Sequence, residues 1–177
     1  MKNIFLAMSF ALAFVTAPAV IAVPHAAAQE AASLETMEAE VEALLVANAN
    51  DPEAFAAAIE AYVLAAADAE LAADAVISVL TNPTGEAAQL ALANNPGLKA
   101  AGGKGLGAAI AQIGLTNPTV AANMQAKVEA SNDETLQASV AEGNAERTAS
   151  IQQQQAAESG DTAESNDSTP ETPVSPN

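Results

Sequence analysis

The run Gly97–Gly107 is rich in glycine and lysine and is the segment that most resembles a phosphate-binding loop. Such a loop needs the spacing G-x-x-x-x-G-K-[ST] after a strand, so that backbone amides and the lysine surround the phosphates. Here Lys104 is followed by Gly105, and Leu98 stands where the first glycine is needed. The dinucleotide spacing G-x-G-x-x-G fails too, because Ile110 takes the place of its last glycine. The sequence therefore argues against phosphate binding of either kind.

Carboxylates are the other residues whose spacing suggests chemistry. Glu35, Glu38 and Glu42 lie on neighbouring helical turns, and so do Glu70 and Asp74. A glycosidase site pairs two carboxylates, normally in a cleft with aromatic surfaces, but the chain after residue 28 has only one Phe and one Tyr. We interpret these acids as solvated helix faces, with loose calcium or magnesium association as the alternative.

Other catalytic and metal-binding side chains are scarce. The chain has no Cys, and its one His, His25, lies near the N-terminus. Ser–His and Cys–His catalysis need an imidazole base, and transition-metal sites favour imidazole or thiolate ligands. There is no calcium loop of the D-x-[DN]-x-[DN]-G type, and no serine stands in a Ser–Lys motif. The sequence predicts no catalytic, cofactor-binding or metal-binding residue, and a protein that is not an enzyme.

The N-terminus has the three parts of a secretory signal peptide. Lys2 precedes the apolar stretch Ile4–Val23, which is followed by the small residues Ala26–Ala28. About 20 apolar residues can also span a bilayer, so an uncleaved anchor is the alternative, although prolines and many alanines disfavour it. We expect cleavage after Ala28 and a periplasmic or extracellular protein.

The rest of the chain divides in two by composition. From Gln152 onward it is polar and acidic, and such a segment buries too little apolar area to offset the entropy of ordering. The predicted organisation is a signal peptide at 1–28, an alanine-rich helical domain at 29–151 and a disordered acidic tail at 152–177.

Apolar residues follow helical spacing and strand patterns are absent, which predicts an all-α fold. Alanine favours this, because it has the highest helix propensity. Ser131 stands three residues before Glu134, the spacing of a capping box. N-capping side chains precede a proline suited to the first helical position at Asp51-Pro52, Asn82-Pro83, Asn95-Pro96 and Asn117-Pro118. The predicted helices cover about 33–48, 53–67, 69–81 and 84–94, then one around Leu106–Ile113, one around Val120–Val128, and a weaker one from Leu136 that runs on to Ile151.

The pentapeptide Leu80–Thr84 recurs as Leu115–Thr119, 35 residues later. Asp51-Pro52 lies 31 residues before Asn82-Pro83, so the spacing matches a repeat of two short helices. The architecture we expect is an irregular bundle or a short solenoid of helical hairpins.

Two interpretations remain for the glycine-rich run: a flexible turn, or close helix packing through Gly103 and Gly107, with an interaction surface at 97–115 as a further alternative.

Charge is strongly acidic and unevenly distributed. The chain has 22 acidic and 5 basic residues, a net charge of -17. All charged residues from Glu30 to Glu86 are acidic, and all charged residues from Ala87 to Val128 are lysines. The rest of the chain is acidic again and has one base, Arg147. Such a protein repels nucleic acid, and membrane contact is a minor alternative. The partner we expect is a protein, or a second copy whose central lysines meet the acidic flanks, and no specific small molecule is indicated.

These features predict a non-catalytic exported helical protein that acts as an interaction or structural module. The alternative is a small envelope accessory factor, similar in role to a chaperone or an inhibitor, that binds a cationic or apolar partner.

Overall fold

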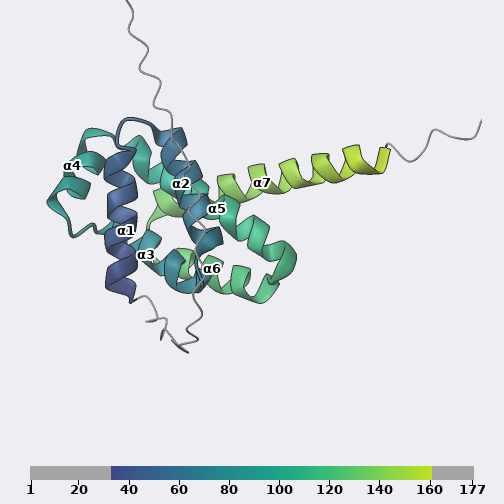
Figure 1. Ribbon diagram of the computed structural model, residues 1–177, viewed down its shortest axis with the longest axis horizontal. Helices are drawn as coiled ribbons and strands as arrows, with labels where there is room; N and C mark the ends of the chain where they lie inside the picture. The colour runs from purple at the N-terminus through teal and green to yellow at the C-terminus, as the bar shows by residue number, and fades with distance from the viewer. Residues whose placement is uncertain (1–32, 161–177) are drawn as a thin grey trace, which may run out of the picture. The chain divides into compact units, whose positions relative to one another are not determined.

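The computed structural model describes residues 33–160, and this part of the chain is all-helical, with seven α-helices and no strand. The prediction of an all-α fold is confirmed. The predicted signal peptide at 1–28 and positions 161–177 of the predicted tail lie outside the described residues. The helices are α1 (Leu34–Ala47), α2 (Pro52–Ala65), α3 (Ala69–Thr81), α4 (Glu86–Asn94), α5 (Gly97–Thr116), α6 (Pro118–Ala130) and α7 (Glu134–Gly160) (Figure 1).

Two of the Asx-Pro pairs begin helices in the predicted way. Asp51 Oδ1 accepts a hydrogen bond from the N–H of Ala54 at 3.0 Å, and α2 starts at the next residue, a proline. Asn117 Oδ1 accepts from the N–H of Val120 at 3.3 Å, and α6 likewise starts at a proline. Each side chain satisfies a backbone donor that the helix itself leaves unpaired.

The pair Asn82-Pro83 does not begin a helix: Asn82 ends α3, and no side chain caps the start of α4. Glu42 of α1 accepts hydrogen bonds from the N–H groups of Thr84 and Gly85 at 2.7 and 2.8 Å. Helix α4 begins at Glu86, two residues after the predicted start.

The predicted capping box at Ser131 is wrong by two residues. The side chain that caps α7 is Asp133, whose Oδ1 accepts from the N–H of Leu136 at 2.9 Å. Ser131 instead ends α6, donating from its Oγ to the carbonyl of Val128 at 2.6 Å. Between them Asn132 has φ 52°, a left-handed conformation that asparagine tolerates better than most residues.

Helix α5 is the central element of the described fold, and it contacts α2, α3, α4, α6 and α7. The glycine-rich run therefore lies within a helix, and the prediction of a flexible turn there is wrong. Glycine costs about 1 kcal/mol in a helix interior, but here it allows the backbones of α2 and α7 to approach. A Cβ atom at Gly105 would overlap the carbonyl oxygen of Ala56 in α2, and one at Gly107 would overlap that of Val140 in α7.

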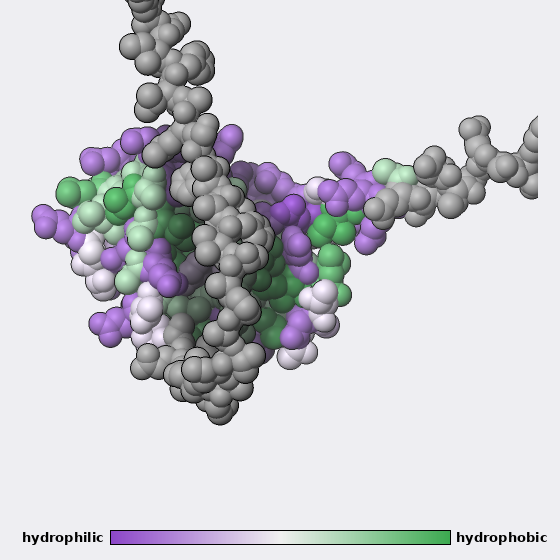
Figure 2. All heavy atoms as spheres, viewed as in Figure 1, coloured by the Kyte–Doolittle hydropathy of each residue, from purple (hydrophilic) through white to green (hydrophobic). Residues whose placement is uncertain are grey.

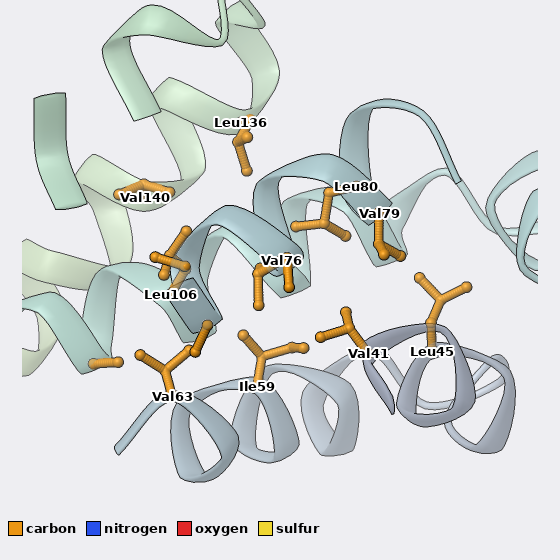
Figure 3. Close-up of a cluster of buried hydrophobic side chains, with 14 of the residues drawn as sticks. Val41, Leu45, Ile59, Val63, Val76, Val79, Leu80, Leu106, Leu136 and Val140 are labelled. Carbon is orange, nitrogen blue, oxygen red and sulfur yellow. The ribbon is translucent and has the colours of Figure 1, made fainter. Parts of the chain in front are cut away.

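The core lies between α5 and the helices around it. In Figure 3 the side chains of Ile59 and Val41, from α2 and α1, point towards Val76 of α3, and Leu136 approaches from α7. The largest fully buried side chains include Phe55, Leu45, Ile59, Leu80, Leu98, Leu106, Ile110, Met124 and Leu136. Alanine fills much of the remaining core, including Ala72, Ala73, Ala75, Ala88 and Ala109.

Some leucines lie outside this core. Leu34 and Leu90 are exposed, although the spacing of apolar residues assigns Leu34 to the buried face of α1. Leu115 is 61% exposed at the end of α5. Figure 2 shows hydrophobic surface over the turn between α5 and α6, next to hydrophilic side chains. These three exposed leucines thus lie on separate helices, Leu34 on α1, Leu90 on α4 and Leu115 on α5.

Helix α7 continues beyond Ile151 to Gly160, so residues 152–160 are helical where the sequence predicts a disordered tail. Its C-terminal end extends past the other helices in Figure 1, and residues 152–157 are exposed. Glutamine and alanine have favourable helix propensity, so this segment prolongs an established helix without an apolar face of its own.

The two copies of the pentapeptide share local geometry but occupy different environments. Asn82 and Asn117 have nearly the same backbone angles, φ -151° with ψ 70° and φ -142° with ψ 78°. Leu80 is nevertheless fully buried and Leu115 is exposed. The contacts of α2 with α5, and of α5 with α7, also skip elements along the chain.

Candidate functional site

Every Lys and Arg of the described chain forms an ion pair with an acid from another helix or the start of one. The bases come from α5, α6 and α7, and the acids from α2, α3, α7 and the residue before α7. The pairs are Lys99–Asp133 at 2.7 Å, Lys104–Glu142 at 2.7 Å, Lys127–Asp74 at 2.6 Å and Arg147–Glu60.

These ion pairs connect the lysine-containing segment of the chain with the acidic segments before and after it. Lys99 and Lys104 lie in the lysine block and join α5 to the acidic block that follows it. Lys127, from the same block, joins α6 to the acidic block that precedes it. The lysines therefore have acidic partners within the same chain.

A cleft with a volume of about 550 Å³ lies between α2 and α7 and is also lined by α5. Helix α2 supplies Glu53 and Glu60, α5 supplies Lys104, and α7 supplies Glu146 and Arg147. The remaining lining residues are small, namely Ala56, Ala57, Gly105, Ala108, Gly143 and Ser150. A volume of this size is typical of small-molecule sites.

A second hollow of about 240 Å³ continues the cleft along the junction of α2 and α5. It shares Glu53, Ala56 and Lys104 with the first hollow. Its other lining residues are Pro52, Gly97, Ala100 and Ala101. The two hollows together form one groove, which we call the α2–α5 groove.

The basic groups of the groove are held by carboxylates. Lys104 Nζ donates to Glu142 Oε1 at 2.7 Å and lies 3.8 Å from Glu146 Oε1. The hydrogen bond to Glu142 is the main cause that raises the pKa of Lys104 above its ordinary value. Arg147 pairs with Glu60, whose side chain is 17% exposed, while Arg147 Nε is buried and has no hydrogen-bond partner among the described residues.

This arrangement does not suit Ser–Lys catalysis. Ser150 and Lys104 line the same cleft, but the lysine of such a pair must lose its proton to act as a base. The raised pKa keeps Lys104 protonated at neutral pH. Lys104 therefore acts in this cleft as a hydrogen-bond donor to Glu142.

The carboxylates singled out in the sequence do not gather in one site. Glu42 accepts hydrogen bonds from the N–H groups of Thr84 and Gly85, just before α4, and Asp74 pairs with Lys127. Glu70 accepts a hydrogen bond from Asn123 Nδ2 at 2.9 Å, and Glu35 is exposed in the first turn of α1. Within residues 33–160 no group of three acidic or histidine side chains is placed to hold a metal ion.

Tyr62 is the one tyrosine of the chain, and its hydroxyl donates to Glu40 Oε2 at 3.0 Å. Burial, followed by the influence of Glu40, raises its pKa far above the ordinary value. The phenol is therefore a fixed hydrogen-bond donor that ties α2 to α1, and it is not a proton carrier at neutral pH.

Sequence reasoning missed the groove residues Glu53, Glu60, Glu146 and Arg147. The one local signal is that Arg147 is the only arginine of the chain and lies in an acidic segment. Its partner Glu60 is far away in sequence, so spacing alone does not connect them.

None of the described helices is both long enough and hydrophobic enough to cross a bilayer. No protein-family model, curated protein or solved structure matches this chain.

Proposed function

We propose that this chain is a non-catalytic exported helical protein that acts as an interaction module in the periplasm or outside the cell. The observation that carries the proposal is the pairing of every Lys and Arg of the described residues within the chain. Residues 33–160 contain seventeen Asp and Glu but only four bases, so the unpaired charge on the surface is acidic.

An acidic surface of this kind attracts positively charged partners and repels anions over a Debye length. Exposed acids that form no ion pair among the described residues are found on separate helices, among them Glu35 on α1, Glu86 on α4 and Glu129 on α6. The accessory-factor alternative is supported by the same surplus of acid, and in its apolar form by the exposed Leu90 and Leu115.

Export is tested first, by expressing the full chain and measuring the mass of the protein recovered outside the cytoplasm. A mature protein that begins at Gln29 is expected. Recovery of the intact chain from the cytoplasm alone would overturn this part of the proposal.

The interaction is tested by affinity capture from an envelope extract with the processed protein as bait. A matched bait has Glu35, Glu86 and Glu129 each replaced by Gln, changes that alter surface charge without touching the core. We expect basic proteins on the unmodified bait and fewer on the variant. Equal capture by both baits, or no capture, contradicts a role based on acidic charge.

A further inference from the structure

The α2–α5 groove is lined by small residues from three helices. The α5 residues that line it run from Gly97 to Ala108. At 1.5 Å per residue this corresponds to a length of about 16 Å. The lining Ala and Gly residues have no polar side chain, so they form an apolar strip along the floor.

Two carboxylates beside this strip are not fully neutralised by bases. Glu53 lines both hollows and has no hydrogen bond or ion pair among the described residues. Glu146 lies on α7 and shares Lys104 with Glu142: Lys104 Nζ is 3.8 Å from Glu146 Oε1 and 2.7 Å from Glu142 Oε1, so one positive charge serves two carboxylates. One carboxylate comes from α2 and the other from α7, so they belong to opposite sides of the cleft.

The basic groups of the groove are already neutralised. Lys104 donates to Glu142 at 2.7 Å, and Arg147 is paired with Glu60. An anionic ligand would have to displace these acids and approach a strongly acidic protein. The charge left over in the groove therefore favours a cation.

We propose that the α2–α5 groove binds a free linear polyamine, a triamine or tetraamine, with its methylene chain on the alanine floor and its ammonium groups at Glu53 and Glu146. A lysine side chain offers the same chemistry but only one ammonium group per alkyl chain, whereas this groove has acids on two walls. The inference names a ligand for one site and goes beyond the proposed function, which concerns the protein's surface as a whole.

Titration calorimetry at low salt on the processed full-length protein tests the assignment, with spermidine and spermine as probes. We expect saturable binding with one site per chain. Glu53→Gln and Glu146→Gln should each weaken it about fivefold, as expected for loss of one partly exposed charge contact. Glu129→Gln removes an exposed acid outside the groove and should leave the affinity unchanged.

A second pair of variants separates groove binding from general attraction to acid. Ala57→Leu fills the cleft without changing charge and should abolish the saturable site. Ala61→Leu makes the same change at an exposed position of α2 outside the lining and should not. If both behave alike, or if Glu129→Gln weakens binding as much as Glu53→Gln, the groove is not the site.

Two further probes decide the source of the ammonium groups. A lysine-rich peptide that binds the groove as tightly as spermidine would overturn the assignment to a free polyamine. If magnesium ions displace spermidine at an equal concentration of charge, spermidine is bound only as a loose counter-ion. That result would also overturn the assignment to a free polyamine. Either failure leaves the proposed function standing, because capture of basic proteins depends on acids such as Glu35 and Glu86, which do not line the groove.

Discussion

Gly143 of α7 lies directly against the backbone carbonyl of Lys104 in α5, with no room between them for a methyl group. Gly103 and Gly107 allow the same approach from the α5 side, against Ser139 and Val140. The interpretation of these glycines as helix-packing positions is therefore confirmed, and the partner helix is α7. The surface of contact is a backbone-to-backbone seam rather than an interdigitated set of large side chains.

Gly143→Ala should destabilise the protein by about 1–3 kcal/mol, the usual cost of overpacking. The atoms that the new methyl would meet belong to the backbone of Lys104, which cannot rotate away. The measurement is the free energy of unfolding from urea titration followed by circular dichroism.

Gly114→Ala is the matched control in α5. A Cβ atom there would meet only Ala121 Cβ, at an ordinary 3.7 Å. It should stabilise the protein by about 0.5–1 kcal/mol, since alanine is the better helix former. Equal effects of the two changes would mean that α5 and α7 are not in close contact.

The two copies of the pentapeptide should respond differently to the same substitution. Leu80→Ala should cost about 2–5 kcal/mol, because Leu80 is fully buried. Leu115→Ala should stay within about 0.5 kcal/mol, because that leucine is 61% exposed. Chemical unfolding of both variants measures the difference, and similar losses would support a structural repeat instead.

Asp133 makes the stability of the fold depend on pH in the acidic range. Lys99, and then the N–H of Leu136, hold the pKa of the Asp133 carboxyl below its ordinary value of 3.8. A carboxyl with a lowered folded-state pKa stabilises the fold fully above its ordinary pKa, and that contribution is lost as pH falls through the lowered value.

Asp133→Asn should therefore lower stability at neutral pH by up to about 1 kcal/mol, since the pair is partly exposed. Its difference from the unmodified protein should shrink as the pH falls below 3.8. Asparagine can still accept the capping hydrogen bond of α7. Alanine cannot, so Asp133→Ala should lower the free energy of unfolding by about 1 kcal/mol more than Asp133→Asn does. A difference that does not change with pH would show that the Asp133 charge does not stabilise the fold.

Glu42→Ala should loosen the start of α4. The N–H groups of Thr84 and Gly85 lose their acceptor, at a cost of about 1 kcal/mol. Hydrogen exchange by NMR should show faster exchange at these two amides. Glu38→Ala, on the same helix but without such bonds, should leave the exchange rates unchanged, and slow exchange at both amides in Glu42→Ala would refute the assignment.

The predictable part of this fold is the part specified by neighbouring residues. The starts of α2 and α6 follow from Asp51 and Asn117, which act on their own helices. The buried stripe Met37, Val41 and Leu45 follows from apolar spacing alone.

The remainder depends on partners that are distant in sequence. The same Asx-Pro signal at Asn82 starts no helix, and the backbone that follows it is bound by Glu42 of α1. The glycine-rich run is helical only because α2 and α7 pack against it. The groove likewise includes the ion pair between Glu60 and Arg147. These residues are far apart in the sequence, so no local pattern predicts their contact.

The glycines of α5 also determine how cooperative this fold is. Five lie inside the helix, at a combined cost of about 5 kcal/mol relative to alanine, so the helix exists only while α2 and α7 enclose it. A chain truncated before Glu134 therefore lacks the support that α5 needs, and loss of α7 by fraying or proteolysis releases the central helix with it. Folding of residues 33–150 is consequently close to all-or-none, and the native state forms only after the last helix has been synthesised.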